Sequence, residues 1–198
     1  MKEGNMVSIR RGDMDDFYFV AEIDLVSEGI SQENSYLPVS FEEESEYFDK
    51  IARFLEPSLN TSETEFTACP KYTLICEDGE NKERIGLIMF LIRNMNDPAF
   101  QHFGIYDKFE RSVFPADGRV CEIFQLWVAP GQRRRGLATE LMKKAEEIAL
   151  HNNIKMIYTH TEAVNDHVVE LCEKLGYEVI RKGTLWDEIV RISQVKYL

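Results

Sequence analysis

Cysteine is scarce and scattered in this sequence. The 198 residues include four cysteines, and no two of them form a C-x-x-C pair. Small disulfide-built domains and structural zinc sites both need closely spaced cysteines. We therefore expect no bound metal, and reduced, partly buried thiols at Cys69, Cys76, Cys121 and Cys172.

Long apolar runs are also missing. No apolar stretch reaches the ~20 residues that a membrane-spanning helix needs. The opening residues, MKEGNMVSIRRGDMDD, contain no apolar core followed by a small-residue cleavage site, which is the pattern of a secretory signal. With 44% hydrophobic and 29% charged residues, the composition is that of a folded globular protein. We expect a cytoplasmic protein that does not enter a membrane.

An excess of positive charge is absent as well. The chain has 23 Lys and Arg against 35 Asp and Glu, a net charge of -12, which argues against a general nucleic-acid binder. Residues 13–65 hold 15 acids and 2 bases, so this third carries the whole acidic excess. The acids either create a field that attracts cationic ligands or simply solvate the surface of one helix.

What the chain does contain is an informative stretch from Cys121 to Leu150. An apolar strand pattern ends at Pro130, and a helix pattern follows, with apolar residues at 137, 141, 145 and 148. Between them lies a turn with three arginines and small residues at 136 and 138. Because the first amides of a helix lack intrahelical acceptors, this turn is a candidate phosphate or pyrophosphate site. A solvated basic turn is the alternative.

Two segments resemble signatures of the GNAT superfamily of acyl-CoA-dependent N-acetyltransferases. Residues 133–138, RRRGLA, are similar to the family's acyl-CoA-binding pattern Q/R-x-x-G-x-G/A. Residues 165–177, NDHVVELCEKLGY, resemble the downstream pattern N-x-x-A-x-x-L-Y-E-K-x-G-F. The resemblance is dense from 120 to 182, and the order of predicted elements extends it over the whole chain.

The patterns along the chain predict alternating strands and helices. Strands are expected near 7–10, 72–76, 84–92, 121–128, 154–161, 177–181 and 189–197, and helices near 15–28, 40–55, 137–150 and 164–175. This order, which is the one that the resemblance implies, predicts an α/β fold with a central mixed, mostly antiparallel sheet flanked by helices. We expect residues 1–198 to form a single GNAT-like domain.

Residues 94–119 form an aromatic-rich insertion where GNAT-like folds usually have a short loop. Long connections in compact domains tend to be functional or disordered, and this one is too aromatic for a disordered linker. We expect it to form a wall of the acceptor pocket or a homodimer contact, with a plain cover for the sheet as the alternative. Its aromatic residues and histidine are Phe100, His102, Phe103, Tyr106, Phe109 and Phe114.

The resemblance implies acetyl-CoA as co-substrate. The backbone of the strand end would pair with the pantetheine arm, and the turn and first helical residues would hold the pyrophosphate. Asn165 would lie near the cofactor arm, although an ordinary helix cap explains it equally well. The expected cofactor-binding residues are Leu126, Trp127, Val128, Arg133, Arg134, Arg135, Gly136, Leu137, Ala138, Thr139 and Asn165.

Glu122 is the expected catalytic base. Its position fourteen residues before Gly136 resembles that of the strand glutamate that deprotonates the amine in one branch of the family. A charged residue at a strand edge is the alternative, and His160 is a second candidate base. Cys172 stands where the family commonly has a tyrosine acid, so Tyr158, Tyr177 or water would have to supply that proton.

The leading interpretation is an N-acetyltransferase that transfers an acetyl group from acetyl-CoA to a primary amine. The amine would belong to a cationic small molecule or a peptide, without nucleic acid or membrane partners. The alternative is a catalytically inactive GNAT-like module that binds acyl-CoA and regulates a partner, an idea supported by the missing tyrosine. The sequence identifies neither the acceptor nor the oligomeric state.

Overall fold

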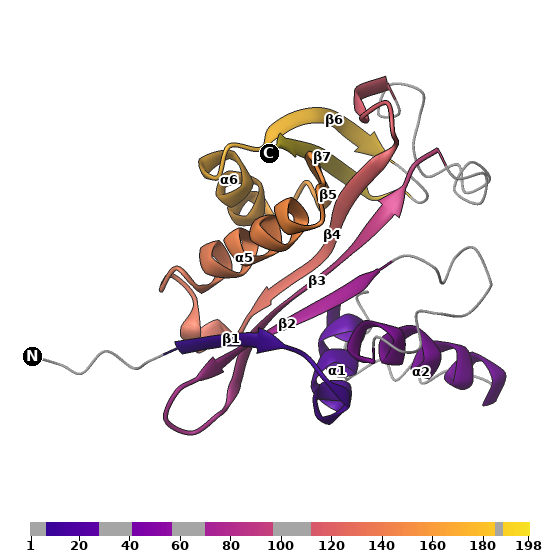
Figure 1. The fold of residues 1–198 in the computed structure, drawn as a ribbon. Helices are drawn as coiled ribbons and strands as arrows, with labels where there is room; N and C mark the ends of the chain where they lie inside the picture. The colour runs from indigo at the N-terminus through magenta and orange to yellow at the C-terminus, as the bar shows by residue number, and fades with distance from the viewer. Residues whose placement is uncertain (1–6, 28–40, 57–69, 97–111, 185–187) are drawn as a thin grey trace, which may run out of the picture. The chain divides into compact units, whose positions relative to one another are not determined.

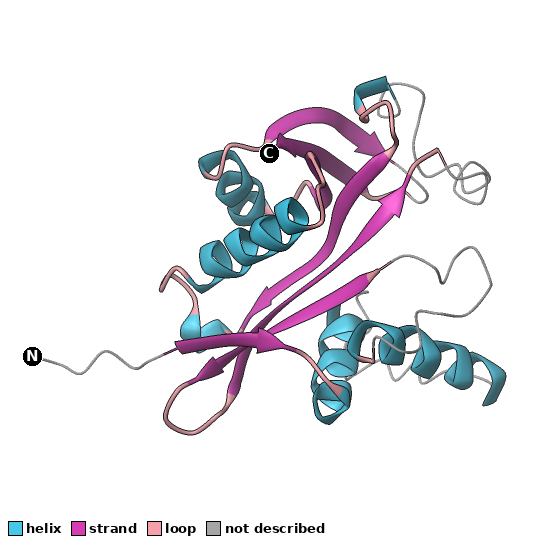
Figure 2. Ribbon diagram, viewed as in Figure 1, coloured by secondary structure: helices cyan, strands magenta, loops and turns pink. Residues whose placement is uncertain are grey.

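The computed structural model describes residues 7–27, 41–56, 70–96, 112–184 and 188–198. Figure 1 labels the elements along the chain, and Figure 2 colours them by type. In order they are β1 (Val7–Arg11), η1 (Met14–Asp16), α1 (Phe17–Ser27), α2 (Phe41–Leu55), β2 (Lys71–Asp78), β3 (Arg84–Asn94), β4 (Arg119–Val128), η3 (Pro130–Gln132), α5 (Leu137–His151), β5 (Met156–Glu162), α6 (Asp166–Lys174), β6 (Glu178–Thr184) and β7 (Val190–Tyr197).

The strands form one mixed sheet in the order β1-β2-β3-β4-β5-β7-β6. β4 and β5 are parallel, whereas β1 with β2, β5 with β7 and β6 with β7 are antiparallel. Four α-helices in the described residues flank this sheet. The predicted fold class, α/β with a mixed and mostly antiparallel sheet, is confirmed.

The chain divides into two compact units. One comprises Met1–Met89 and Gln125–Leu141, and the other comprises Phe90–Phe124 and Met142–Leu198. β3, β4 and α5 each begin in one unit and end in the other. A single GNAT-like domain over the whole chain stays a prediction.

In the first unit, two helices bury apolar side chains beside the β1–β2 pair. β1 and β2 pair from Val7 opposite Asp78 to Arg11 opposite Leu74. α2 contacts both α1 and β2. Removing apolar surface from water stabilises this packing by roughly 25 cal/mol per Å². The buried apolar residues of the two helices are Phe17, Val20, Ile23, Ile51, Phe54 and Leu55.

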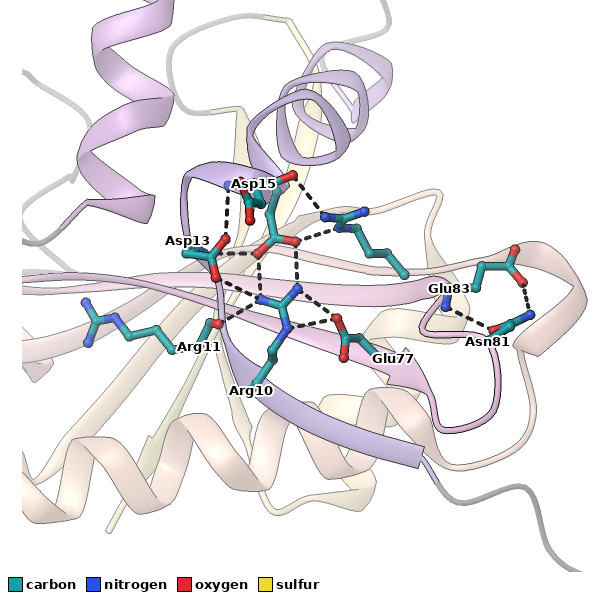
Figure 3. Close-up of polar contacts among 9 residues, drawn as sticks. Arg10, Arg11, Asp13, Asp15, Glu77, Asn81 and Glu83 are labelled. Atoms are coloured by element: carbon teal, nitrogen blue, oxygen red, sulfur yellow. Dashed lines mark hydrogen bonds and ion pairs between the residues drawn. The ribbon is translucent and has the colours of Figure 1, made fainter.

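A partly buried ion-pair network joins the end of β1 to η1 and to the β2–β3 hairpin. Arg10 donates to both carboxylate oxygens of Asp16, at 2.7 and 2.8 Å, and to Glu77 at 2.8 Å. Figure 3 shows Arg10 with Asp13 and Glu77 around it. Arg84 of β3 also donates to Asp16. Asp13 and Asp16 form a capping box at the start of η1.

Opposing effects set the pKa of Asp16. Burial by itself raises the pKa of this carboxyl, but hydrogen bonds from Arg10 and Arg84 outweigh burial and lower it to about 2. The same contact with Asp16 raises the pKa of Arg10, against the effect of burial. The network is therefore charged at neutral pH.

In the second unit, side chains alternate between two faces of the β5–β7 pair. Lys196 contacts Glu146 of α5 at 2.7 Å, and Gln194 donates to the Val169 carbonyl of α6, so both helices cover the face that carries residues 194 and 196. Tyr158 and Val195 pair in register on the opposite face. Phe114 packs its ring there against Tyr158, with centroids 5.5 Å apart.

The ends of several elements differ from the expectation. β4 begins at Arg119 rather than 121, and α6 begins at Asp166 rather than 164. Of the aromatic insertion, 94–96 and 112–119 are described, and Phe114 packs as a cover for the sheet. The other five of its named residues, Phe100, His102, Phe103, Tyr106 and Phe109, lie outside the described residues, as does Cys69.

Three cysteines are described, and each is buried as a free thiol: Cys76, Cys121 and Cys172. In the described residues, no His, Cys, Asp and Glu side chains gather into a group of three that could hold a metal ion. None of the helices in this described part of the chain has the length and hydropathy of a membrane span.

Candidate functional site

The turn between β4 and α5 contains two residues with positive φ. Arg134 and Gly136 both have left-handed conformations, with φ of 65° and 84°. A Cβ on Gly136 would have no atom within 4 Å. Glycine at 136 therefore serves the backbone conformation, not a close contact within the protein. Leu137 then begins α5, whose first amides have no acceptor within the helix and favour an anion.

Two of the three arginines bond within the turn. Arg133 donates from Nε to the Val128 carbonyl at 3.1 Å, and Arg135 donates to the side chain of Gln132. The arginines and Gly136 are exposed, Ala138 and Thr139 are half-buried, and Leu137 is buried. The turn thus combines exposed positive charge with a helix N-terminus, the arrangement expected of an anion site.

The end of β4 is attached to β3. Ala129 donates its amide to the Ile85 carbonyl at 2.9 Å, and the Trp127 carbonyl lies 3.2 Å from where a Cβ on Gly86 would stand. Trp127 also packs edge-on against Phe19, with ring centroids 5.8 Å apart. The structure places the predicted residues Leu126, Trp127, Val128 and 133–139 in the first unit, whereas Glu122 and Asn165 belong to the second.

Glu122 is a buried carboxylate in an ion pair. It lies on β4 in register with Tyr158 of β5, and 5% of the residue is exposed. Its Oε2 is 2.8 Å from Nε of Arg93, near the end of β3. The parallel register places Glu122 on the sheet face of Tyr158, opposite the face that α5 and α6 cover.

A histidine and two hydroxyls lie along the same face. His160 follows Tyr158 by two residues, with the ring centroids 5.9 Å apart, and the Tyr158 hydroxyl donates to Ser193 at 3.4 Å. Burial lowers the pKa of His160; Glu122 opposes this shift, whereas Arg191 and Arg93 add to it. A neutral imidazole can accept a proton, so Glu122 and His160 are both candidate bases.

The candidate proton donors differ in where they lie. Cys172 is 1% exposed on α6, and burial raises its thiol pKa to about 12, with a smaller contribution from Glu173. Tyr177 is also buried. Burial raises the pKa of its hydroxyl, and the charge of Glu146 raises it further. Both lie on the helix-covered side of the sheet. Of the candidate donors, Tyr158 shares the face of Glu122.

Asn165 occupies the N-cap position of α6. Among the described residues, its side chain makes no capping hydrogen bond. Asp13, by contrast, accepts a hydrogen bond from the Asp15 amide at the start of η1. The explanation of Asn165 as an ordinary helix cap is therefore weakened, and its contact with a cofactor stays a prediction.

Sequence reasoning missed the residues that surround Glu122. Arg93 follows an apolar run that predicts a buried strand, and Arg191 and Ser193 lie in the last strand. A charged residue at the end of such a run is a signal that could have marked Arg93. The ion pair of Arg93 with Glu122 could not be predicted, because contacts between side chains of neighbouring strands depend on the register of the strands.

Comparisons with known proteins identify the family of the chain. A sequence model of the Acetyltransferase (GNAT) family matches residues 35–177. Among curated proteins, none matches the sequence.

Solved structures of acetyltransferases have a similar fold. NAA60 of Arabidopsis thaliana in complex with acetyl-CoA is 16% identical with a TM-score of 0.62, covering 98% of this chain and 99% of that one. Spermidine N-acetyltransferase of Vibrio cholerae, in complex with CoA and spermine, is 17% identical with a TM-score of 0.60, covering 96% and 95%. The NatC complex bound to Gag peptide and CoA is 17% identical with a TM-score of 0.60, covering 97% and 98%.

Proposed function

The chain belongs to the GNAT family of acetyltransferases, and from this premise we propose that it transfers an acetyl group from acetyl-CoA to a primary amine. The observation that carries the proposal is the turn before α5, where Gly136 adopts a left-handed conformation and exposed arginines precede a helix N-terminus. Such a turn fits a pyrophosphate, because amide donors, macrodipole and side-chain charge all favour an anion.

Donor binding follows from this turn. In our proposal the amides and side chains of Arg133 to Thr139 hold the pyrophosphate. Leu126 and Val128 continue β4 beyond Ile123, the last residue that pairs with β5, and their backbone groups would bind the pantetheine arm as an added strand. Trp127 and Asn165 complete the proposed cofactor set. Acetyl-CoA supplies the acetyl thioester, and no metal is required.

Proton transfer is assigned to the face that carries Glu122. Glu122 takes the proton of the attacking amine. His160 is the alternative base, because it interacts electrostatically with Glu122 and because burial lowers the pKa of its imidazole. Tyr158 would supply the proton for the departing thiolate, since it pairs in register with Glu122. Cys172, whose pKa is raised to about 12, is a poor donor.

The acceptor that we propose is a cationic small molecule or a peptide amine. The acidic region 13–65 favours a positively charged substrate. Two of the similar structures contain spermine and a peptide, which represent these two classes. A cytoplasmic location and a homodimer contact through residues 94–119 belong to the same proposal.

A catalytically inactive acyl-CoA-binding module is the second candidate function. It is favoured by Cys172, which stands in the place of the usual tyrosine and is 1% exposed. In that case the turn before α5 would still bind CoA, but no amine would be acetylated.

Turnover distinguishes the two candidates. Free thiol released from acetyl-CoA would be measured with spermidine, spermine, glucosamine and a peptide with a free α-amine. We expect turnover with at least one amine, and loss of about 10²- to 10⁴-fold in kcat/KM for Glu122→Gln, with CoA affinity unchanged by calorimetry.

Other outcomes reassign the roles. If His160→Gln loses activity while Glu122→Gln keeps it, His160 is the base. Micromolar CoA binding without turnover on any amine would support the binding module instead.

A further inference from the structure

We infer that Arg93 is the positioning residue that fixes the carboxylate of Glu122 for proton transfer. This inference rests on the proposed function, because it assigns a role within the same reaction. It adds a residue from β3 to the catalytic arrangement, and neither the family pattern nor the sequence motifs point to that residue.

Arg93 and Glu122 form a close ion pair. Arg93 Nε lies 2.8 Å from Glu122 Oε2, and the two side chains are 11% and 6% exposed. At this distance the guanidinium attracts the carboxylate electrostatically, and the attraction is strong because little water screens the pair. The contact joins neighbouring strands, so both ends of the pair are held by the sheet.

Burying a charge is costly. A carboxylate taken out of water without a partner favours its neutral form, which cannot accept a proton. A fixed guanidinium favours the ionised form instead. Arg93 thus supplies the opposite charge that a buried carboxylate such as Glu122 requires.

Other groups around Glu122 must be considered in any pH experiment. Cys121 precedes it on β4, Tyr158 and His160 face it from β5, and Arg191 lies on β7. His160 titrates as a base, so its own protonation also lowers activity in acid. A variant of Arg93 must therefore be compared in backgrounds with and without Glu122.

The test uses the full chain, acetyl-CoA and the most active amine of the panel above. Arg93→Met should lower kcat about 10- to 100-fold and move the acidic limb of the pH–rate profile to higher pH, because an adjacent opposite charge is lost. The KM for acetyl-CoA should not change. Arg93→Lys should restore part of kcat and return the acidic limb toward its original pH.

A double-mutant cycle separates positioning from a general structural effect. If Arg93 acts through Glu122, Arg93→Met should cause no further loss of kcat in the Glu122→Gln background. This double variant carries a neutral pair, so it should fold even if Arg93→Met alone does not. Equal losses in both backgrounds, or an unmoved acidic limb, would overturn the inference.

Arg119 provides a matched control. It lies on β4 in the same unit and donates to the Asn152 carbonyl at 3.0 Å. Arg119→Met should lower the melting temperature without moving the pH profile. Full activity of Glu122→Gln would remove the base of the proposed function, whereas additive losses would remove only the role of Arg93. No turnover on any amine would remove both.

Discussion

Gly136 and Arg134 show how single residues shape the turn before α5. Both are left-handed, but only glycine adopts this conformation without strain. The sequence motif predicts the glycine, because the G-x-A pattern marks it. The motif does not predict that Arg134 is also left-handed, because arginine is not a residue type that favours positive φ.

Replacing Gly136 should therefore disturb donor binding through the backbone. Gly136→Val forces a β-branched residue into the left-handed region, at a cost of about 1 to 3 kcal/mol, and should weaken CoA binding by about tenfold or more. Arg134→Ala should weaken it less, because the proposed contacts are made mainly by amides. Isothermal titration calorimetry with CoA measures both.

Gly131 is the matched control in the same turn. It has no positive φ, and a Cβ there would meet no atom within 4 Å, so Gly131→Val should leave CoA affinity nearly unchanged. A larger loss for Arg134→Ala than for Gly136→Val would contradict the amide-based account of pyrophosphate binding.

Glu122 and Arg93 show the limit of prediction at this scale. A glutamate within an apolar strand is visible in the sequence, and its distance from Gly136 suggests a role. Its buried partner comes from another strand, and a shift of one residue in register would turn the side chain to the other face. The assignment of either residue to catalysis stays a prediction.

At the scale of elements, Asp16 ties β1, η1 and the β2–β3 hairpin together. Its side chain is fully buried, and two arginines hold its pKa at about 2. A carboxyl whose folded pKa is below its unfolded value stabilises the fold above the unfolded pKa, near ~4. This stabilisation is lost as pH falls from about 5 to 2.

The stability of Asp16→Asn should reveal this dependence. At pH 7 the free energy of unfolding of the variant should be at least about 2 kcal/mol lower than that of the parent. This difference should become smaller toward pH 3. Urea unfolding across this pH range measures it. Glu83→Gln, at an exposed position of the same hairpin, should change stability little, and a pH-independent difference for Asp16→Asn would argue against the network.

The sequence predicted most elements but not all their ends. Apolar periodicity located the strands and helices of both units, and the glycine at 176 marked the end of α6 correctly, with φ of 85°. β2 and β4 are longer than expected, and in β2 pairing with β1 extends the strand through the polar residues Glu77 and Asp78. Tertiary pairing of this kind leaves no local signal.

At the scale of the whole molecule, charge should govern acceptor capture. The net charge of -12 comes from residues 13–65, so a polycation should be attracted more than a monoamine. Raising NaCl from about 0.02 to 0.3 M shortens the Debye length to under 10 Å and should lower kcat/KM several-fold for spermine but less for ethanolamine. Steady-state rates at each salt concentration test this. Equal salt dependence would indicate that the acids only solvate the surface.

The fold class followed from the order of elements, whereas the division into units did not. Alternating strands and helices with two motifs were enough to predict a GNAT-like sheet, which the structure confirms. β3, β4 and α5 each begin in one unit and end in the other. The positions at which they do so depend on contacts between residues distant in the sequence, and no change in composition marks them. The sequence also left the acceptor-binding residues unidentified, because the acidity of 13–65 and the aromatic content of 94–119 do not specify one ligand.

The discontinuity of the first unit has a consequence for synthesis on the ribosome. Because Gln125–Leu141 belongs with Met1–Met89, the N-terminal segment alone lacks part of its own core when it emerges. Vectorial folding, in which N-terminal portions fold first, is thus delayed until Leu141 has left the exit tunnel. The turn with Gly136 is among the last parts of the first unit to be synthesised. We therefore expect nascent chains halted before this turn to expose apolar surface and to depend on chaperones.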